Sequence, residues 1–299
     1  MTSGIKLFDK EISPAVSHNL NIFKTKHGYH GIARFDSDVR RTVFMEKIGP
    51  SNQLVEFVFD KDFRIKSKII KKITGKTQGL KFEDYRSFVY KEKTYYCVAY
   101  IDKDFNTYMG LLDSQYKFLG NIVTGSDYMM SFVNNKKVYW EKNWLFFEQS
   151  GDLYFVYSSN PNLVIYKCDN FQNLTFSKVV DKVNPFNHLL PQNELYFSSN
   201  TTTGGSTNPV YFKNLESYVY LIHTKIYHQR RYNHFLIGFD IDFNITFLNP
   251  FPLVSSAIEY GLMFVTSMLY EKDYVILSGG IEDNQNFVYK IPRNRVKIF

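Results

Sequence analysis

Short runs of alternating apolar and polar residues, separated by polar turns, fill most of the chain. This alternation predicts β-strands, and the three-to-four-residue spacing of an amphipathic helix is nearly absent. Five segments share one plan, in which an apolar strand leads into a polar turn and then into a second strand that opens with a tyrosine. They are NLNIFKTKHGYHGIARF, RSFVYKEKTYYCVAYI, WLFFEQSGDLYFVYS, NPVYFKNLESYVYLIH and GLMFVTSMLYEKDYVILSG.

The five equivalent tyrosines indicate an internal repeat that fills the chain. They are Tyr29, Tyr95, Tyr154, Tyr218 and Tyr274, and successive ones lie 66, 59, 64 and 56 residues apart. Short strands repeated radially are typical of a β-propeller, which protects its sheet edges by closing into a ring. We therefore expect an all-β protein, a single five-bladed β-propeller with a central substrate funnel. A pair of β-sandwiches with coincidental spacing is the alternative.

The repeat also predicts how the chain is divided. Residues 1–299 are expected to form one domain, with blades at roughly 15–75, 80–135, 140–195, 203–250 and 257–299. Either the N-terminal segment Ile5–Phe8 or the C-terminal segment Arg295–Ile298 would complete the last blade.

Composition narrows the class of protein. The 299 residues are 44% hydrophobic, as in a globular chain with a sizeable core, and no apolar run reaches the roughly 18 residues of a membrane span. The N-terminus lacks the pattern of a secretory signal, and the two cysteines, Cys97 and Cys168, cannot form a disulfide framework. We expect a soluble, cytoplasmic protein.

The net charge of +7 comes from scattered Lys and Arg, unlike the basic arm of a nucleic-acid-binding protein. Anionic small ligands fit this charge, and nucleic acid is not an expected partner. The Cys and His spacing matches no metal site, and no glycine loop of a dinucleotide or nucleotide site follows a strand. No cofactor or metal is therefore expected.

Polar or small residues come just before the first strand of every repeat. These clusters are His18–Asn21, Glu83–Arg86, Glu141–Trp144, Gly204–Pro209 and Glu259–Gly261. The innermost strands of a propeller all run the same way along the axis, so their leading ends should meet at one mouth of the funnel. A concave site with convergent polar groups is typical of small-molecule binding. The alternative is that each cluster is only a solvated loop.

Several of these clusters resemble the blade motifs of a known family. The matching segments are Phe82-Glu83-Asp84-Tyr85-Arg86-Ser87-Phe88, then Lys142-Asn143-Trp144, then Gly204-Gly205-Ser206-Thr207-Asn208-Pro209 leading to His223, and finally Glu259, Gly279-Gly280 and Asp283. They look like successive motifs of the five-bladed β-mannoside phosphorylases of glycoside hydrolase family 130 and of the related β-1,2-mannosyltransferases. The resemblance implies a propeller that acts on mannosides.

The resemblance assigns the central chemistry to Asp84. In the family, a Glu-Asp-Pro-Arg motif supplies the carboxylic acid that drives protonation of the glycosidic oxygen, and here Tyr85 replaces the proline. On an extended strand, Asp84 and Arg86 would share one face while Glu83 and Tyr85 take the other. An adjacent guanidinium lowers a carboxyl pKa, whereas a general acid needs it held up.

Three resolutions of this conflict are open. Another carboxylate, such as Glu83 or Glu259, neutralises Arg86, or Asp84 serves as a substrate ligand and not as an acid. In the third, the Asp84–Arg86 pair only ties the start of the blade together.

The resemblance also implies a phosphate site. Phosphorylases of the family bind phosphate with two arginines and a histidine; the histidine matches His223, but Lys142 and Ser158 stand at the arginine positions. Lysine is a point charge without the bidentate fork of arginine, and serine has no charge, so free phosphate should bind weakly. A phosphate already attached to a sugar or nucleotide would gain affinity from the rest of the donor.

The Lys-Asn-Trp motif looks more like the transferase branch than the phosphorolytic one. Lys142 would contact an anionic leaving group, Asn143 a sugar hydroxyl, and Trp144 would stack on a pyranose face. Core packing is the alternative for Trp144, and a satisfied interior histidine is the alternative for His223.

A shared offset adds Arg34 to the candidates. It follows Tyr29 by five residues, as His223 follows Tyr218 and Gly279 follows Tyr274, so these positions should be equivalent in their blades. The remaining candidate sugar ligands are Asn21, Arg86, Gly205, Thr207, Glu259 and Asp283.

The expected function is glycosyl transfer from a phosphate-bearing sugar donor, either a sugar phosphate or a nucleotide sugar, to a glycan acceptor. Mannoside phosphorolysis or hydrolysis is the enzymatic alternative, and a hydrolase would pair Asp84 with Asp283 or Glu259. A noncatalytic glycan-binding or scaffolding propeller is the third hypothesis, because fold does not fix function.

Overall fold

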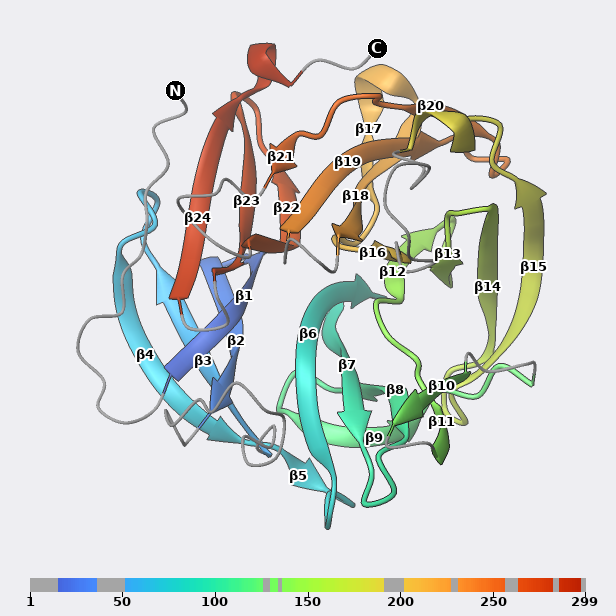
Figure 1. Ribbon diagram of the computed structural model, residues 1–299. Helices are drawn as coiled ribbons and strands as arrows, with labels where there is room; N and C mark the ends of the chain where they lie inside the picture. The colour runs from blue at the N-terminus through green and yellow to red at the C-terminus, as the bar shows by residue number, and fades with distance from the viewer. Residues whose placement is uncertain are drawn as a thin grey trace.

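The computed structural model of the protein describes residues 16–36, 52–125, 130–133, 136–190, 202–226, 231–255, 263–281 and 285–296. These residues form a five-bladed β-propeller whose blades surround a central axis (Figure 1). The described residues contain strands and short 3₁₀ turns but no α-helix. The predicted all-β propeller is confirmed. Within the described ranges, no helix is long and apolar enough to cross a membrane.

Each blade is an antiparallel sheet built from consecutive strands. Blade 1 holds β1 (Val16–Thr25), β2 (Gly28–Asp36), β3 (Gln53–Phe59) and β4 (Ile65–Lys72). Blade 2 holds β6 (Lys81–Tyr90), β7 (Lys93–Ile101), β8 (Thr107–Leu112) and β9 (Lys117–Asn121), with β5 (Thr74–Gly75) parallel to β9. Blade 3 holds β12 (Leu145–Gln149), β13 (Asp152–Ser158), β14 (Asn162–Asn170) and β15 (Thr175–Val183).

Blade 4 holds β16 (Thr202–Gly205), β17 (Val210–Phe212), β18 (Ser217–Ile226), β19 (Arg231–Phe239), β20 (Ile245–Leu248) and β21 (Val254–Ser255). Blade 5 holds β22 (Met263–Tyr270), β23 (Tyr274–Ile281) and β24 (Gln285–Pro292). A hairpin of β10 (Met130–Val133) and β11 (Lys136–Tyr139) lies between blades 2 and 3 in the sequence, and the 3₁₀ turns are η1 (Asn187–Leu189), η2 (Lys213–Leu215) and η4 (Arg293–Arg295).

The repeat found in the sequence is the inner hairpin of each blade. The five equivalent tyrosines all lie at the start of the second strand of that hairpin, in β2, β7, β13, β18 and β23. The prediction of one domain over residues 1–299 includes segments outside the described residues and stays a prediction. The expectation that Ile5–Phe8 forms the closing strand also concerns residues outside the described ranges, and it stays a prediction. The alternative closing segment starts at Arg295, which lies in η4 and not in a strand.

Apolar clusters fill the spaces between neighbouring blades. There are five such clusters among the described residues, and each takes buried side chains from the two blades that flank it. The cluster between blades 1 and 2, for example, joins Ile32 and Leu54 to Tyr85 and Val98. Burial of this apolar surface is the main force that holds the blades side by side.

Polar contacts join the first blade to the last. The Leu20 carbonyl of β1 accepts hydrogen bonds from Thr266 Oγ1 (2.5 Å) and Ser278 Oγ (2.7 Å), both in blade 5. The Leu20 N–H donates to Asn286 Oδ1 (3.1 Å), and Asn286 Nδ2 donates to the Ser17 carbonyl (3.2 Å). All of these groups are buried, so the blade 5 side chains satisfy backbone groups of β1 that water cannot reach.

Replacing Asn286 with alanine should therefore destabilise the ring at its closure. The Leu20 N–H and the Ser17 carbonyl would lose partners while buried, and each such loss costs about 1–3 kcal/mol, so we expect the free energy of unfolding to fall by about 2 kcal/mol or more. Denaturant unfolding measures this change. Asn162→Ala, which removes only a hydrogen bond to Asp181 on the outer strands of blade 3, is the matched control. An equally small effect of both substitutions would show that closure does not depend on Asn286.

Candidate functional site

Irregular backbone at the leading ends of the inner strands directs polar side chains toward the axis. The pairing of β1 with β2 shifts register between His18 and Asn21, and that of β6 with β7 shifts between Glu83 and Arg86. Within these bulges, Asn19 and Asp84 have φ of 59° and 54°, in the left-handed region that Asn and Asp tolerate better than most residues. Asn143, just before β12, has a φ of 66°.

Because of the bulge in β6, the side chains of the Glu83–Arg86 segment are arranged differently from the expected alternation. We expected Asp84 and Arg86 on one face of the strand and Glu83 and Tyr85 on the other. Instead Tyr85 is buried in the core between blades 1 and 2, and Glu83 and Asp84 both join the polar cluster near the axis. The prediction was wrong because a bulge interrupts the strict alternation of side chains.

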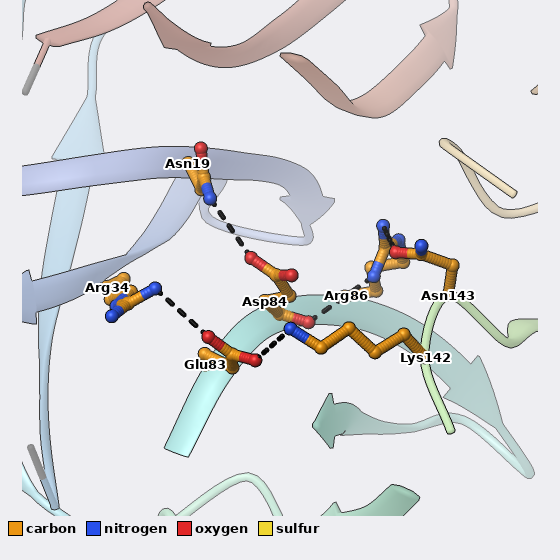
Figure 2. Close-up of polar contacts among 7 residues, drawn as sticks. All are labelled: Asn19, Arg34, Glu83, Asp84, Arg86, Lys142 and Asn143. Atoms are coloured by element: carbon orange, nitrogen blue, oxygen red, sulfur yellow. Dashed lines mark hydrogen bonds and ion pairs between the residues drawn. The ribbon is translucent and has the colours of Figure 1, made fainter. Parts of the chain in front are cut away.

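Seven residues from blades 1, 2 and 3 form a connected polar cluster (Figure 2). Asn19 Nδ2 donates to Asp84 Oδ1 at 3.0 Å. The Glu83 carboxylate pairs on one side with Arg34 of β2, at 3.1 Å, and on the other side with Lys142. Polar residues far apart in the sequence thus meet at one end of the inner strands, as expected from the propeller.

Arg86 joins blade 2 to blades 3 and 4. Its guanidinium donates to the Ser206 carbonyl (2.9 Å) and to Asn143 Oδ1 (2.8 Å), and more weakly to the Asp84 carbonyl (3.4 Å). These acceptors are neutral oxygens. Glu83, which we considered as the group that neutralises Arg86, pairs with Arg34 and Lys142 instead.

The charges around Asp84 keep it ionised. Burial raises the pKa of this carboxyl, but the positive charges of Lys142, Arg86 and Arg34 and the hydrogen bond from Asn19 outweigh burial, so its pKa lies below the ordinary value. The cluster holds three cations against two carboxylates, a formal charge of +1. Asp84 is therefore a carboxylate at neutral pH, and the cluster as a whole favours an anion.

Lys142 remains a cation. Burial lowers its pKa, but the Glu83 and Asp84 charges outweigh burial and raise it. Its ammonium also lies 4.9 Å from the centre of the Trp140 ring. We expected Lys142 to contact an anionic leaving group, and in this structure it pairs with a carboxylate of the protein itself.

His223 is a neutral histidine next to the cluster. Its Nδ1 lies 3.0 Å from Ser206 Oγ, and burial, followed by the charges of His234 and Arg86, lowers its pKa well below the ordinary value. The ring packs closely on Gly204, where a Cβ would come within 2.7 Å of His223 Cε1. His223 is therefore a hydrogen-bonding group that adds no positive charge to the cluster.

The structure places Trp144 in the core. The side chain is 1% exposed, its ring stacks on Phe155 with centroids 4.5 Å apart, and its Nε1 donates to Glu141 Oε2 at 3.2 Å. The expected stacking of Trp144 on a sugar needs an open ring face, which this packing does not leave. Trp144 is therefore a core residue, which was the alternative interpretation of this position.

Three further candidates support the blades and do not face the cluster around Asp84. Asn21 donates to the Thr266 carbonyl (2.9 Å) and accepts from the Ser87 N–H (3.0 Å), and it lines a separate cavity of about 400 Å³ farther along the inner strands. Thr207 is fully buried and its Oγ1 accepts from the Leu221 N–H. Gly205 allows close packing, since a Cβ there would lie 2.6 Å from the Asn143 carbonyl.

Two candidates, Glu259 and Asp283, lie outside the described residues. Conversely, sequence reasoning did not select Asn19, although it named the polar segment that contains it. Its hydrogen bond to Asp84 joins residues 65 positions apart, and both residues have a left-handed backbone. Among the described residues, no group of three or more His, Cys, Asp or Glu side chains could hold a metal ion.

Comparison with known proteins identifies the fold but no family by sequence. No protein-family model matches the chain. No curated protein sequence matches it.

Several solved structures have a similar fold. A glycosyl hydrolase from Bacteroides ovatus has a TM-score of 0.63 at 13% identity, over 99% of this chain and 96% of its own. A second structure has a TM-score of 0.63 at 12% identity, over 95% of this chain and 86% of its own. It comes from work on the GH130 family of mannoside phosphorylases, which contains glycoside hydrolases that target β-1,2-mannosidic linkages in Candida mannan.

The β-1,2-mannobiose phosphorylase from Listeria innocua, in complex with β-1,2-mannobiose, has a TM-score of 0.56 at 12% identity, over 95% of this chain and 92% of its own. At this identity the similarity establishes a shared propeller fold.

The lowered pKa of Asp84 predicts a pH-dependent stability difference between the protein and its Asp84→Asn variant. A carboxyl whose pKa is lower in the folded chain stabilises the fold above its unfolded pKa, and that contribution is lost as the pH falls through the folded-state value. We expect Asp84→Asn to lower the thermal midpoint at pH 7, and the difference to close below about pH 4.

Thermal scans of both proteins from pH 7 to pH 3 measure this difference. Asp62→Asn, an exposed aspartate in the turn between β3 and β4, should shift the midpoint little and is the control. A midpoint difference between Asp84→Asn and the parent that stays constant below pH 4 would contradict the lowered pKa of Asp84.

Proposed function

We propose that this protein is a carbohydrate-active enzyme that makes or breaks a mannoside-type glycosidic bond at the Asp84 end of the central funnel. The observation that carries the proposal is an ionised carboxylate, Asp84, held on a bulged inner strand beside three cations. The similar folds of glycoside hydrolases and mannoside phosphorylases support it.

The charge state of Asp84 suits the role of a general base, which is the role that glycosyl transfer would give it. A general acid must carry a proton before the reaction, whereas a general base must be ionised. Asp84 is ionised when the site is empty, so it is ready to accept a proton from the hydroxyl of a sugar acceptor. We therefore propose glycosyl transfer as the main reaction.

In this reaction the acceptor oxygen attacks the anomeric carbon of the donor and its proton passes to Asp84. The bond from the anomeric carbon to the donor phosphate breaks, and the electron pair leaves on the phosphate oxygen. An anionic donor bound near Arg86 and Lys142 would offset their charges and raise the pKa of Asp84, which would make the carboxylate a stronger base. His223 and Asn143 would donate hydrogen bonds to phosphate and sugar oxygens.

Phosphorolysis or hydrolysis is the second candidate function. Either reaction would require Asp84 to give a proton to the leaving oxygen, and the same rise in pKa on binding an anion would help phosphorolysis. The solved structures with similar folds favour this candidate, since those compared above are a glycosyl hydrolase and mannoside phosphorylases or their relatives.

A noncatalytic glycan-binding propeller was suggested by Tyr85 in place of the family's proline. Tyr85 is fully buried between blades 1 and 2, so this replacement alters the core and removes no group from the polar cluster around Asp84. The replacement is therefore a weaker argument against catalysis than the sequence alone implied.

Mass-spectrometric assays of turnover test the proposal. The purified protein is incubated with mannose 1-phosphate or nucleotide-linked mannose and with manno-oligosaccharide acceptors, and we expect an extended oligosaccharide. Asp84→Asn should lower the rate about 100-fold or more, because a positioned general base contributes about 10²–10⁴-fold.

Asp62→Asn, an exposed aspartate, is the control and should retain the rate of the parent protein. Shortening of the oligosaccharide only when phosphate is added would identify a phosphorylase, and shortening without phosphate a hydrolase. Binding of mannosides without any turnover would contradict catalysis.

A further inference from the structure

The excess positive charge of the chain is concentrated along one outer edge of the propeller. We expected this charge to come from scattered Lys and Arg. Residues 63–82, however, hold seven Lys or Arg and no Asp or Glu, so this segment alone carries a charge of +7, which equals the net charge of the whole chain. The rest of the chain has as many acidic as cationic side chains. The excess is therefore local.

Most of this segment belongs to β4, the outermost strand of blade 1. Among the described strands β4 pairs with β3 alone, and it lies on the outer rim of the ring (Figure 1). β4 contains four lysines, of which Lys66 and Lys72 are exposed, and Lys71 Nζ lies 3.4 Å from Glu56 Oε2 of β3. One glutamate against four lysines leaves β3 and β4 with a formal charge of +3.

Exposed isoleucines lie between these lysines. Ile65, Ile69 and Ile70 are 43%, 48% and 49% exposed. Ile69 and Ile70 are adjacent, so they project from opposite faces of the sheet, and solvent reaches both faces of this edge. The strand therefore presents apolar and cationic side chains together, and we call this surface the β4 edge.

The outer strand of blade 3 has the apolar groups without the charge. In β15, Val179 and Val183 are 48% and 73% exposed, so exposed apolar side chains alone do not distinguish β4. The two lysines of β15 are accompanied by an aspartate, and Lys178 Nζ lies 2.8 Å from Asp181 Oδ2. The β4 edge thus differs from β15 by its excess of lysines.

We propose that the β4 edge docks the propeller on the surface of an anionic lipid bilayer. A lysine close to such a surface gains about fivefold in affinity from the negative headgroups. The isoleucines would enter the boundary between headgroups and acyl chains, where apolar side chains leave water. Asp84 lies on an inner strand near the axis, so docking through the rim does not cover its cluster. The inference does not depend on the proposed function.

Two other kinds of partner fit the β4 edge less well. A soluble polyanion such as a nucleic acid would use the lysines but would leave the isoleucines in water, and β4 has no aromatic side chain on which a base could stack. A β-strand added from another protein is disfavoured, because lysines on an edge strand discourage pairing with a further strand. A bilayer uses both kinds of side chain.

Co-sedimentation of the full-length protein with lipid vesicles tests this inference. We expect binding to phosphatidylcholine vesicles that contain about 30% phosphatidylserine to be at least about tenfold tighter than to phosphatidylcholine alone, and to weaken in high salt. Lys66→Gln combined with Lys72→Gln should weaken this binding at least about tenfold.

The matched control is Lys178→Gln combined with Lys182→Gln in β15. It removes the same amount of charge away from the β4 edge, where screening limits its effect, so we expect a change below about twofold. Equal binding to the two kinds of vesicle, or an equal loss in the two double variants, would overturn the inference.

Substitution of isoleucines separates a bilayer from a soluble polyanion. Ile69→Ser combined with Ile70→Ser should weaken vesicle binding about fivefold or more, because less apolar area leaves water, and should leave binding to duplex DNA unchanged. Val179→Ser combined with Val183→Ser in β15 is the control and should leave vesicle binding unchanged.

Circular dichroism shows whether each variant folds. If the variant with both isoleucines replaced does not fold, Ile65→Ser alone takes its place, with an expected loss of about twofold or more. Binding of duplex DNA without binding of anionic vesicles would overturn the inference, as would vesicle binding that is indifferent to the isoleucine substitutions.

Discussion

The joining of β1 to blade 5 is the contact on which both the ring and the site depend. Side chains of Thr266, Ser278 and Asn286 satisfy buried backbone groups of Leu20, which directly follows Asn19. Gly280 of the same blade lies against Asn19, where a Cβ would come within 2.3 Å of Asn19 Oδ1. The strand that closes the ring therefore also fixes the residue that holds Asp84.

The cluster near the axis is organised for chemistry more than for stability. Burying a charged group costs several kcal/mol, unless an opposite charge pairs with it and offsets the cost. Arg86 is almost fully buried, yet its guanidinium donates to neutral carbonyl and amide oxygens. Such an arrangement leaves a positive excess beside Asp84 that an anionic ligand can use. Neutral His223 adds a hydrogen-bonding group without increasing that excess.

The features that the sequence predicted well are those set by local patterns or by ring topology. Alternating apolar residues and hairpin turns are local, so the five tyrosine-led hairpins were predicted correctly. Convergence of Asp84, Lys142 and Asn143 follows once five inner strands run in one direction around an axis. The burial of Trp144 was not decided by the sequence, because an aromatic ring near a funnel can pack inward or face a sugar, and only the stacking on Phe155 settles which.

The bulge in β6 accounts for the largest departure from the sequence-based picture. Alternation assigns adjacent residues to opposite faces, and nothing in the letters Glu-Asp-Tyr-Arg marks Asp84 as left-handed. Yet only a break in alternation lets two adjacent carboxylates reach the same cluster. Glu83 then pairs directly with Arg34 and Lys142, while Asp84 accepts from Asn19 and lies in the field of the same cations and Arg86, so one local irregularity gives consecutive acidic residues different contacts.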